Sequence, residues 1–164
     1  MSDFLGGTAE LHPETGASPE VAGERALAKM HLESGKGHYA NCHYDLAIAE
    51  FNEAIGLDPA DARAYNARGL AYYATADLRR AIADFDQALS LDPEIADAYY
   101  NRGSAFCDRG QHERAIADLD RALAIEPGHA LAPARKWMAE ENFAAQNRSA
   151  HPGRRRGLIG MLMR

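Results

Sequence analysis

The residues best suited to metal binding lie close together: His38, Cys42 and His43, with His31 further upstream. His38 and Cys42 are four residues apart, which is a workable spacing for two ligands on one helix. We expect a helix to end at Cys42 and His43, however, and the shared face is lost there. We therefore interpret His31 and His38 as packed side chains that replace aromatic residues, and Cys42 as a small apolar residue. The sequence predicts no metal site and no cofactor.

Catalytic groupings are equally scarce. Cys42 and Cys107 form no CxxC pair, and the chain contains neither a glycine-rich phosphate loop nor a nucleophile motif. The acidic residues fall on repeated solvent faces or at helix ends. Residues 1–20 contain no Lys, no Arg and no apolar run of signal-peptide length, and no segment approaches the roughly 18 apolar residues that cross a bilayer. These patterns predict a non-enzymatic, cytoplasmic protein without a membrane span.

Charge and composition exclude further classes. The formal net charge is −6, but residues 148–164 contain five arginines and no acid, so the remainder carries −11. Such an acidic body repels a phosphate backbone, which argues against nucleic-acid binding. The 164 residues include one valine and three threonines, whereas alanine is abundant. Because alanine favours helices and β-branched residues favour strands, we expect an all-α fold.

The residues that would support any functional face recur every 34 residues along the chain. Glycine, alanine and proline return in register three times, which chance does not explain for the rarer glycine and proline. The structural positions are Gly35, Gly69 and Gly103; Ala47, Ala81 and Ala115; Ala54, Ala88 and Ala122; and Pro59, Pro93 and Pro127.

Each unit has the pattern of two helices. In the middle unit, Tyr65, Gly69 and Tyr72 share one helical face, a break follows at residues 75–77, and a second apolar stripe runs to Asp92-Pro93. Proline ends that stripe because it cannot continue a helix. Two antiparallel helices approach closely only where a facing side chain is absent or is a methyl group, which explains the glycine and alanine positions.

These residues resemble the tetratricopeptide repeat (TPR) family, whose unit is a 34-residue helix–turn–helix. The resemblance covers repeats at about 28–61, 62–95 and 96–129. The second and third repeats also carry the aromatic pairs Tyr65/Tyr72 and Tyr99/Phe106, where the first has His31 and His38. The resemblance implies a right-handed α-solenoid of three repeats, with the first helix of each repeat lining a concave groove where extended peptides dock.

A second face of each first helix differs from repeat to repeat, as a ligand-binding surface would. It lies roughly 120° from the glycine face at about 100° per residue. We predict a partner-binding groove formed by Lys29, Leu32, Lys36, Tyr39, Arg63, Asn66, Leu70, Tyr73, Asp97, Tyr100, Asn101 and Ser104, with Cys107 and Asp108 beside them. Tyr100 is expected to lie outside the core, and Asp84 on a solvated convex face. Basic residues gather at the first end and Asp97 and Asp108 at the other, so charge would orient a partner.

One activity within the family can be checked against the sequence. Its chaperone-binding members hold a terminal carboxylate with Lys and Asn, then Asn, then Lys and Arg on three first helices. The matching positions here are Leu32, Lys36, Ala67, Asp97 and Asn101. The five-residue pattern is not met, so we do not predict a heat-shock co-chaperone.

The remaining segments complete the expected organisation. Residues 1–18 have a disordered composition, and Ser18-Pro19-Glu20 has the pattern of a helix start. The repeat domain spans 19–147 and ends in a capping helix at about 130–147, in which Trp137 and Met138 should face the third repeat and residues 140–142 water. Residues 148–164 form a basic and apolar tail, suited to weak peripheral contact with lipid or to docking.

The sequence therefore predicts a protein–protein interaction module or scaffold that binds a partner peptide. Its partner and oligomeric state stay open. The alternatives are a self-assembling or membrane-peripheral adaptor acting through the tail, and a helical metal-dependent regulator.

Overall fold

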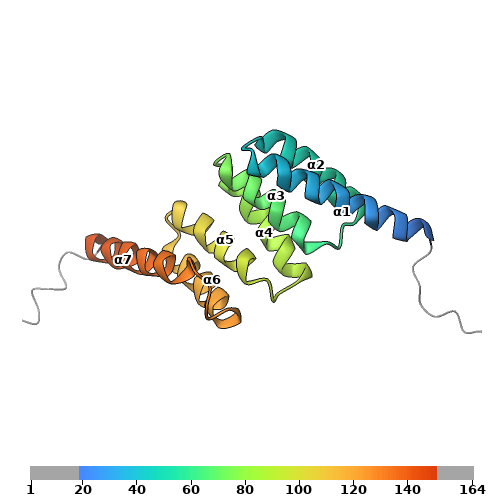
Figure 1. Cartoon of the computed structure of the whole chain (residues 1–164). Coiled ribbons are helices and arrows are strands. Elements are labelled where there is room, and N and C mark those ends of the chain that lie inside the picture. Colours follow the sequence, from blue (N-terminus) through green and yellow to red (C-terminus); the bar gives the residue numbers. More distant parts are fainter. Residues whose placement is uncertain (1–18, 151–164) are drawn as a thin grey trace, which may run out of the picture.

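The computed structural model describes residues 19–150, which form seven helices and no strand. Their bounds are α1 (Pro19–Ala40), α2 (Tyr44–Leu57), α3 (Ala62–Ala74), α4 (Leu78–Leu91), α5 (Ala96–Asp108), α6 (His112–Ile125) and α7 (Ala132–Ala150). We call α1, α3, α5 and α7 the first helices and α2, α4 and α6 the second helices. Consecutive helices pack on one another, and α1 and α7 lie at opposite ends of the array (Figure 1). The expected all-α solenoid is confirmed.

Helix boundaries follow from local chemistry. The Asp61 carboxylate accepts a hydrogen bond from the Arg63 backbone N–H at 2.9 Å, and Asp77 accepts one from Arg80 at 3.0 Å, so both acids cap helix N-termini. The helices α1, α3 and α5 all end in the same way. In α3, the Asp77 N–H donates to the Tyr72 carbonyl and the Ala76 N–H to the Tyr73 carbonyl, a Schellman arrangement with Ala76 in the left-handed region.

The core runs between first and second helices along the glycine positions. A Cβ on Gly35 would lie 2.5 Å from Phe51 Cε1, and one on Gly69 would lie 2.6 Å from Phe85 Cε1. Both phenylalanines are fully buried. A side chain at either glycine would therefore displace an aromatic ring from the core.

The orientation of α7 differs from the sequence prediction. Trp137 is 64% exposed and Met138 is 47% exposed, so neither faces the third repeat as expected. The buried residues of α7 are Ala132 and Ala139 instead. They belong to the core cluster that contains Phe106 and Leu119. Methyl groups let α7 lie close against α6, and this close approach leaves the large side chains outside. Glu140, Glu141 and Asn142 are exposed, as expected.

The ends of the predicted organisation fall partly beyond the described range. The lead-in at residues 1–18 and the tail residues 151–164 lie outside it. Arg148, which the sequence analysis places in the tail, lies within α7. Between residues 19 and 150, no helix is both long and apolar enough to cross a membrane.

Candidate functional site

The clearest hollow on the predicted face lies between α1 and α3. It is a cavity of about 260 Å³ with Lys36 and Tyr39 from α1 on one side. Four residues of α3 form the other side: Arg63, Asn66, Ala67 and Leu70. The Phe51 ring of α2 contributes to the lining. Six of its seven lining residues therefore come from two first helices, and they combine apolar surface with a side-chain amide and two cations.

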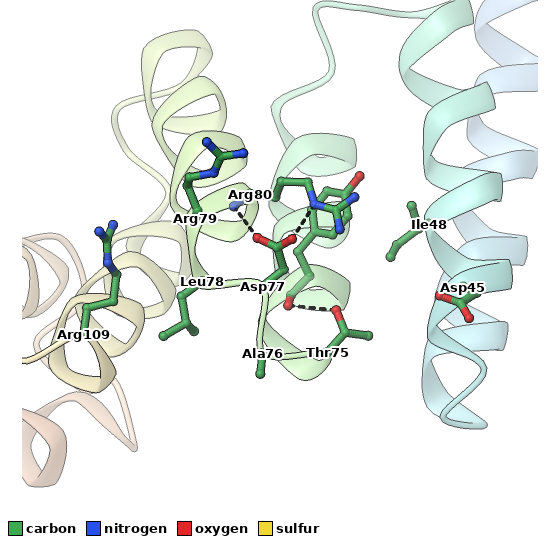
Figure 2. A pocket seen from close by; sticks show the side chains of 10 residues that line it. Asp45, Ile48, Thr75, Ala76, Asp77, Leu78, Arg79, Arg80 and Arg109 are labelled. Carbon is green, nitrogen blue, oxygen red and sulfur yellow. Dashed lines mark hydrogen bonds and ion pairs between the residues drawn. The ribbon is translucent and has the colours of Figure 1, made fainter.

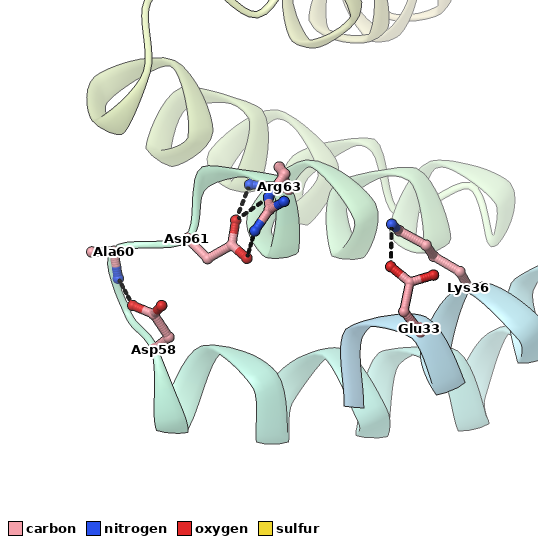
Figure 3. Close-up of polar contacts among 6 residues, drawn as sticks. All are labelled: Glu33, Lys36, Asp58, Ala60, Asp61 and Arg63. Atoms are coloured by element: carbon pink, nitrogen blue, oxygen red, sulfur yellow. Dashed lines mark hydrogen bonds and ion pairs between the residues drawn. The ribbon is translucent and has the colours of Figure 1, made fainter. Parts of the chain in front are cut away.

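The two cations at this cavity are held by neighbours on the same surface (Figure 3). Lys36 Nζ donates to Glu33 at 2.8 Å, and this hydrogen bond holds the pKa of Glu33 below its ordinary value. Arg63 Nε donates to Asp61 at 2.9 Å. Burial alone raises the pKa of Asp61, but the hydrogen bonds from Arg63 outweigh burial and leave the pKa lowered. Lys36, Glu33 and Arg63 are exposed, and exposed pairs of this kind are worth little, so both cations can exchange partners.

The other end of the face is occupied by the protein's own side chains. Tyr73 Oη donates to Asp108 Oδ2 at 2.5 Å. Arg135, from α7, also donates to Asp108 and to the Ser104 carbonyl, the latter at 3.1 Å. Burial together with the Asp108 hydrogen bond raises the pKa of Tyr73 to about 12. Arg135, which was not predicted at this place, therefore neutralises Asp108, one of the two acids at the expected negative end.

Two further contacts involve residues of α5. Asn101 Nδ2 donates to Asn66 Oδ1 at 3.1 Å and so bridges α5 and α3. The Tyr100 ring lies against His129, with ring centroids 4.7 Å apart, so Tyr100 also packs within the protein. His129 Nδ1 accepts the backbone N–H groups of Leu131 and Ala132, and a neutral ring then carries its proton on Nε2, 3.2 Å from Asp97 Oδ1.

The structure divides the predicted groove residues into three groups. Two are buried and unavailable to a partner, contrary to the prediction: Leu32 is 1% exposed in the core, and Ser104 is 5% exposed beneath α7. Those committed to internal hydrogen bonds or ring contacts are Tyr73, Asp97, Tyr100 and Asn101. The cavity between α1 and α3 gathers Lys36, Tyr39, Arg63, Asn66 and Leu70, and Lys29 is exposed on α1.

Two partly buried arginine contacts between helices, which we call the arginine clips, were not predicted from the sequence. Arg68 donates to Asp84 at 2.8 and 2.7 Å and to Asn52 at 2.7 Å, so it joins α3 to α4 and α2. Arg102 binds Asp118 and Asp86 in the same manner, one repeat later. The hydrogen bond to Asp84 raises the pKa of Arg68 above its ordinary value. These arginines, like Asp84 and Asp118, are spaced by one repeat length, which is visible in the sequence and could have revealed them.

Asp84 corrects one expectation directly. It is 6% exposed, so it does not lie on a solvated convex face. An Asp84→Ala change would leave Arg68 partly buried without its partner, which destabilises the fold. Asp84→Ala therefore cannot serve as a neutral control for groove binding. Glu53 on α2 is exposed and has no ion pair within residues 19–150, which makes it the better choice.

A second hollow lies at the edge of the array, by the turn between α3 and α4 (Figure 2). Its volume is about 720 Å³, and its lining includes Asp77, Arg79, Arg80 and Arg109. Arg80 Nε donates to Asp77 at 2.6 Å, and its guanidinium lies over the Tyr72 ring at 4.4 Å. The volume of this hollow exceeds that of the groove cavity, and Arg79 and Arg80 are exposed beside it.

The metal hypothesis finds no geometric basis in the described part of the chain. Within residues 19–150, no group of three His, Cys, Asp or Glu side chains is close enough to hold an ion. Cys42 is exposed, and the His38 and His43 ring centroids are 6.2 Å apart. His31 Nδ1 lies 2.8 Å from Glu50 Oε2, so its ring already has an acidic partner.

Comparisons with known proteins agree with this architecture. No curated protein matches the sequence. Many solved structures are similar, and three of them are TPR domains of the following kinds. The Arabidopsis OM64 TPR domain is 25% identical with a TM-score of 0.71, over 72% of this chain and 98% of that one. The first TPR of Spaghetti (RPAP3) bound to HSP90 peptide SRMEEVD is 25% identical with a TM-score of 0.72, over 73% and 95%. The second TPR domain of human RPAP3 in complex with HSP70 peptide SGPTIEEVD is 26% identical with a TM-score of 0.67, over 73% and 98%.

Family models match the sequence itself. Residues 67–130 match one described as tetratricopeptide repeat, and residues 38–75 match one described as TPR repeat. Together the two matches span residues 38–130, more than half of the chain. They cover the arginine clips and helices α2 to α6, whereas most of α1, including Gly35 and Lys36, lies before them. With its paired helices, its regular repeat register and these matches, the chain belongs to the tetratricopeptide repeat family.

Proposed function

We propose that this chain is a non-enzymatic interaction module that binds an acidic, extended peptide segment of a partner protein at the cavity between α1 and α3. The observation that carries this proposal is the cavity itself, with Lys36 and Arg63 beside an apolar lining of Ala67, Leu70 and Phe51. An apolar side chain of the peptide fills the cavity, and flanking carboxylates replace Glu33 and Asp61 as partners of the two cations.

The Asn66–Asn101 bridge supports an extended peptide backbone at this place. Asn66 uses its carbonyl oxygen in the bridge, so its amide N–H groups remain to donate to a peptide carbonyl. The RPAP3 domains are bound to HSP90 and HSP70 peptides with the acidic ending EEVD. This chain has Leu32, Ala67, Asp97 and Asn101 at four of the positions where the family's carboxylate clamp is expected, and Leu32 is buried. We therefore propose an acidic partner segment gripped by Lys36 and Arg63, rather than a heat-shock protein terminus.

Fluorescence anisotropy with labelled seven-residue peptides tests this proposal. The panel combines acidic or basic flanks with an apolar or polar central residue. Acidic peptides with an apolar centre should bind best. The double change Lys36→Glu and Arg63→Glu should weaken binding at least about tenfold, because attraction becomes repulsion at both cations. Ala67→Leu should weaken binding by filling the cavity.

Glu53→Ala on α2 is the matched control and should leave affinity unchanged. Far-UV circular dichroism of every variant checks that helical content is preserved. Equal binding of basic and acidic peptides, or unchanged affinity in the Lys36/Arg63 double variant, would contradict the proposal.

A further inference from the structure

Three large apolar side chains are exposed at α7: Leu131, which precedes the helix, and Trp137 and Met138 within it. Leu131 is 59% exposed, Trp137 64% and Met138 47%. At about 100° per residue, Trp137 lies roughly 140–160° around the helix from Ala132 and Ala139, the two buried residues. We call Leu131, Trp137 and Met138 the outer face. Terminal repeats normally present a polar face to water. The exposed apolar outer face therefore indicates a surface that another segment covers.

The repeat register indicates what is missing there. Trp137 stands one repeat length after Gly103, at the position where Gly35, Gly69 and Gly103 contact the second helix of their own repeat. In the three repeats, that side is covered by Phe51, Phe85 and Leu119. No second helix follows α7 within the described range, and an indole would exclude one at the usual close approach. An extended segment, which is thinner than a helix, fits at this position.

We propose that this surface is covered by the chain's own residues 154–163, which lie back along α7 with their apolar side chains on the outer face. This segment closely follows α7 and reads RRRGLIGMLM. Its two halves match the helix surface in order. Three arginines come first, and Leu158, Ile159, Met161, Leu162 and Met163 follow.

Length allows this register. Pro152-Gly153, just after the end of α7, is a turn-forming pair, and in this proposal it reverses the chain direction. Residues 154–157, extended after the turn, reach back about 13 Å at 3.3 Å per residue. That length equals about nine helical residues at 1.5 Å each, so Leu158 comes level with Glu141. Residues 159–161 then pass over Met138 and Trp137.

Charge agrees with the same register. In this register Arg156 is the arginine nearest to Glu141, about 7 Å from it along the helix axis at 3.3 Å per residue, and Arg154 and Arg155 lie further toward the end of α7. Lys136 lies 3.6 Å from Glu140, whereas Glu141 is exposed and has no ion-pair partner within residues 19–150. The rest of the chain carries the opposite sign to this segment, so repulsion does not oppose the contact.

Covalent connection favours this occupant over a second copy. A short linker holds the segment at an effective concentration of about 1 mM, far above micromolar protein. The same apolar face on another molecule competes only when the protein concentration approaches that value.

Trp137 is the only tryptophan, so its fluorescence reports on this contact alone. In residues 1–164 we expect emission at shorter wavelength and protection from acrylamide. Replacing Leu158, Ile159 and Leu162 with serine should shift emission to longer wavelength and remove the protection. The matched control replaces Phe4, Leu5 and Leu11 with serine and should change neither. Glu141→Lys should partly expose Trp137 at low salt by repelling the arginines.

Each alternative has its own signature, read on the wild-type chain. Wild-type emission equal to that of the Leu158/Ile159/Leu162 variant overturns the proposal. Protection that grows with protein concentration identifies a second copy as the occupant, and it overturns the proposal too. Protection that is absent in buffer and gained on adding phosphatidylserine vesicles assigns the segment to membrane contact, which also overturns it. Concentration-independent protection that is lost only in the tail variants and in Glu141→Lys supports it.

Discussion

At the scale of single residues, the glycines that face the second helices have a steric role. Gly69 has no room for a Cβ because Phe85 lies in the way, whereas Gly37 on α1 has nothing within 4 Å. Both positions are helical, so a difference between the effects of alanine at Gly69 and at Gly37 comes from their surroundings alone.

Gly69→Ala should therefore destabilise the fold by about 1–3 kcal/mol through overpacking. Gly37→Ala should stabilise it by about 0.5–1 kcal/mol, because alanine has the better helix propensity. Urea unfolding followed by circular dichroism measures both changes. A stabilising Gly69→Ala would mean that the Phe85 contact does not constrain this position.

Tyr73 links stability to alkaline pH. Its folded-state pKa of about 12 is raised above the ordinary value of 10.0, so the protonated phenol is the form that the fold favours. The stabilisation is fully present below pH 10 and is lost as the pH rises through 12.

Tyr73→Phe removes the hydrogen bond to Asp108 and should cost about 0.5–1.5 kcal/mol at neutral pH. The stability difference between wild type and variant should shrink between pH 10 and 12, and the tyrosinate absorbance should lose its latest-titrating component. A difference that stays constant across this range would show that Tyr73 titrates normally.

At the scale of elements, the three turns between first and second helices share one backbone requirement. Cys42, Ala76 and Gly110 occupy the same position in successive repeats, with φ of 59°, 62° and 71°. Only glycine adopts this left-handed region without penalty, so two of the three turns are strained.

Ala76→Gly should stabilise the protein by about 1 kcal/mol, because it relieves the strain at that turn. Gly110→Ala should cost a similar amount at the equivalent position. Thermal and urea unfolding measure the pair. If Ala76→Gly loses stability and Gly110→Ala gains it, flexibility of the unfolded chain outweighs turn strain.

The first repeat lacks the arginine clip, and its acidic residue has a different partner. Ser34 stands where the later repeats have Arg68 and Arg102, and Glu50 stands where they have Asp84 and Asp118. His31, at the position of Tyr65 and Tyr99, supplies the partner for Glu50 instead. In the first repeat, His31 therefore takes the role that Arg68 and Arg102 have in the later repeats, as the partner of the acidic residue.

A double-mutant cycle tests this exchange. His31→Tyr alone should cost about 0.5–1.5 kcal/mol, because Glu50 loses its hydrogen bond. Combined with Ser34→Arg, it should recover at least wild-type stability by recreating the later clip. Additive effects of the two changes would mean that they do not share Glu50.

At the scale of the whole molecule, stability passes from each helix to its neighbours in the array. The α7 helix is joined to the rest through Ala132 and Ala139 in the core, and through Arg135, which reaches Asp108. The two ends of the array are thus far apart along one chain of nearest-neighbour contacts.

Ala139→Arg should detach α7 by placing a charge in the contact with α6. Amide hydrogen exchange should accelerate in α5, α6 and α7 and stay nearly unchanged in α1 and α2. Ala145→Arg, on an exposed position of the same helix, is the control. Uniform acceleration over all seven helices would indicate a single cooperative unit instead.

The sequence by itself determined the all-α class, the repeat register and the family, because these follow from local properties. Helix propensity, proline placement and the periodicity of small residues act within one repeat and return in each of the three. The exposed residues 140–142 follow from the same periodicity. Cation positions along α1 and α3 were also readable, since they depend only on the face of a helix.

Only the tertiary structure decided which groove residues stay free. Arg135 comes from a helix outside the three repeats, so repeat comparison could not place it beside Asp108 and Tyr73. Leu32 is buried although its position belongs to the groove face in sequence. Trp137 and Met138 are large and apolar, so the sequence predicted that they face inward. A close contact between two helices accepts only small side chains, however, and Ala132 and Ala139 occupy it instead. Contacts between distant segments depend on how closely helices approach, which the residue pattern of one helix does not specify.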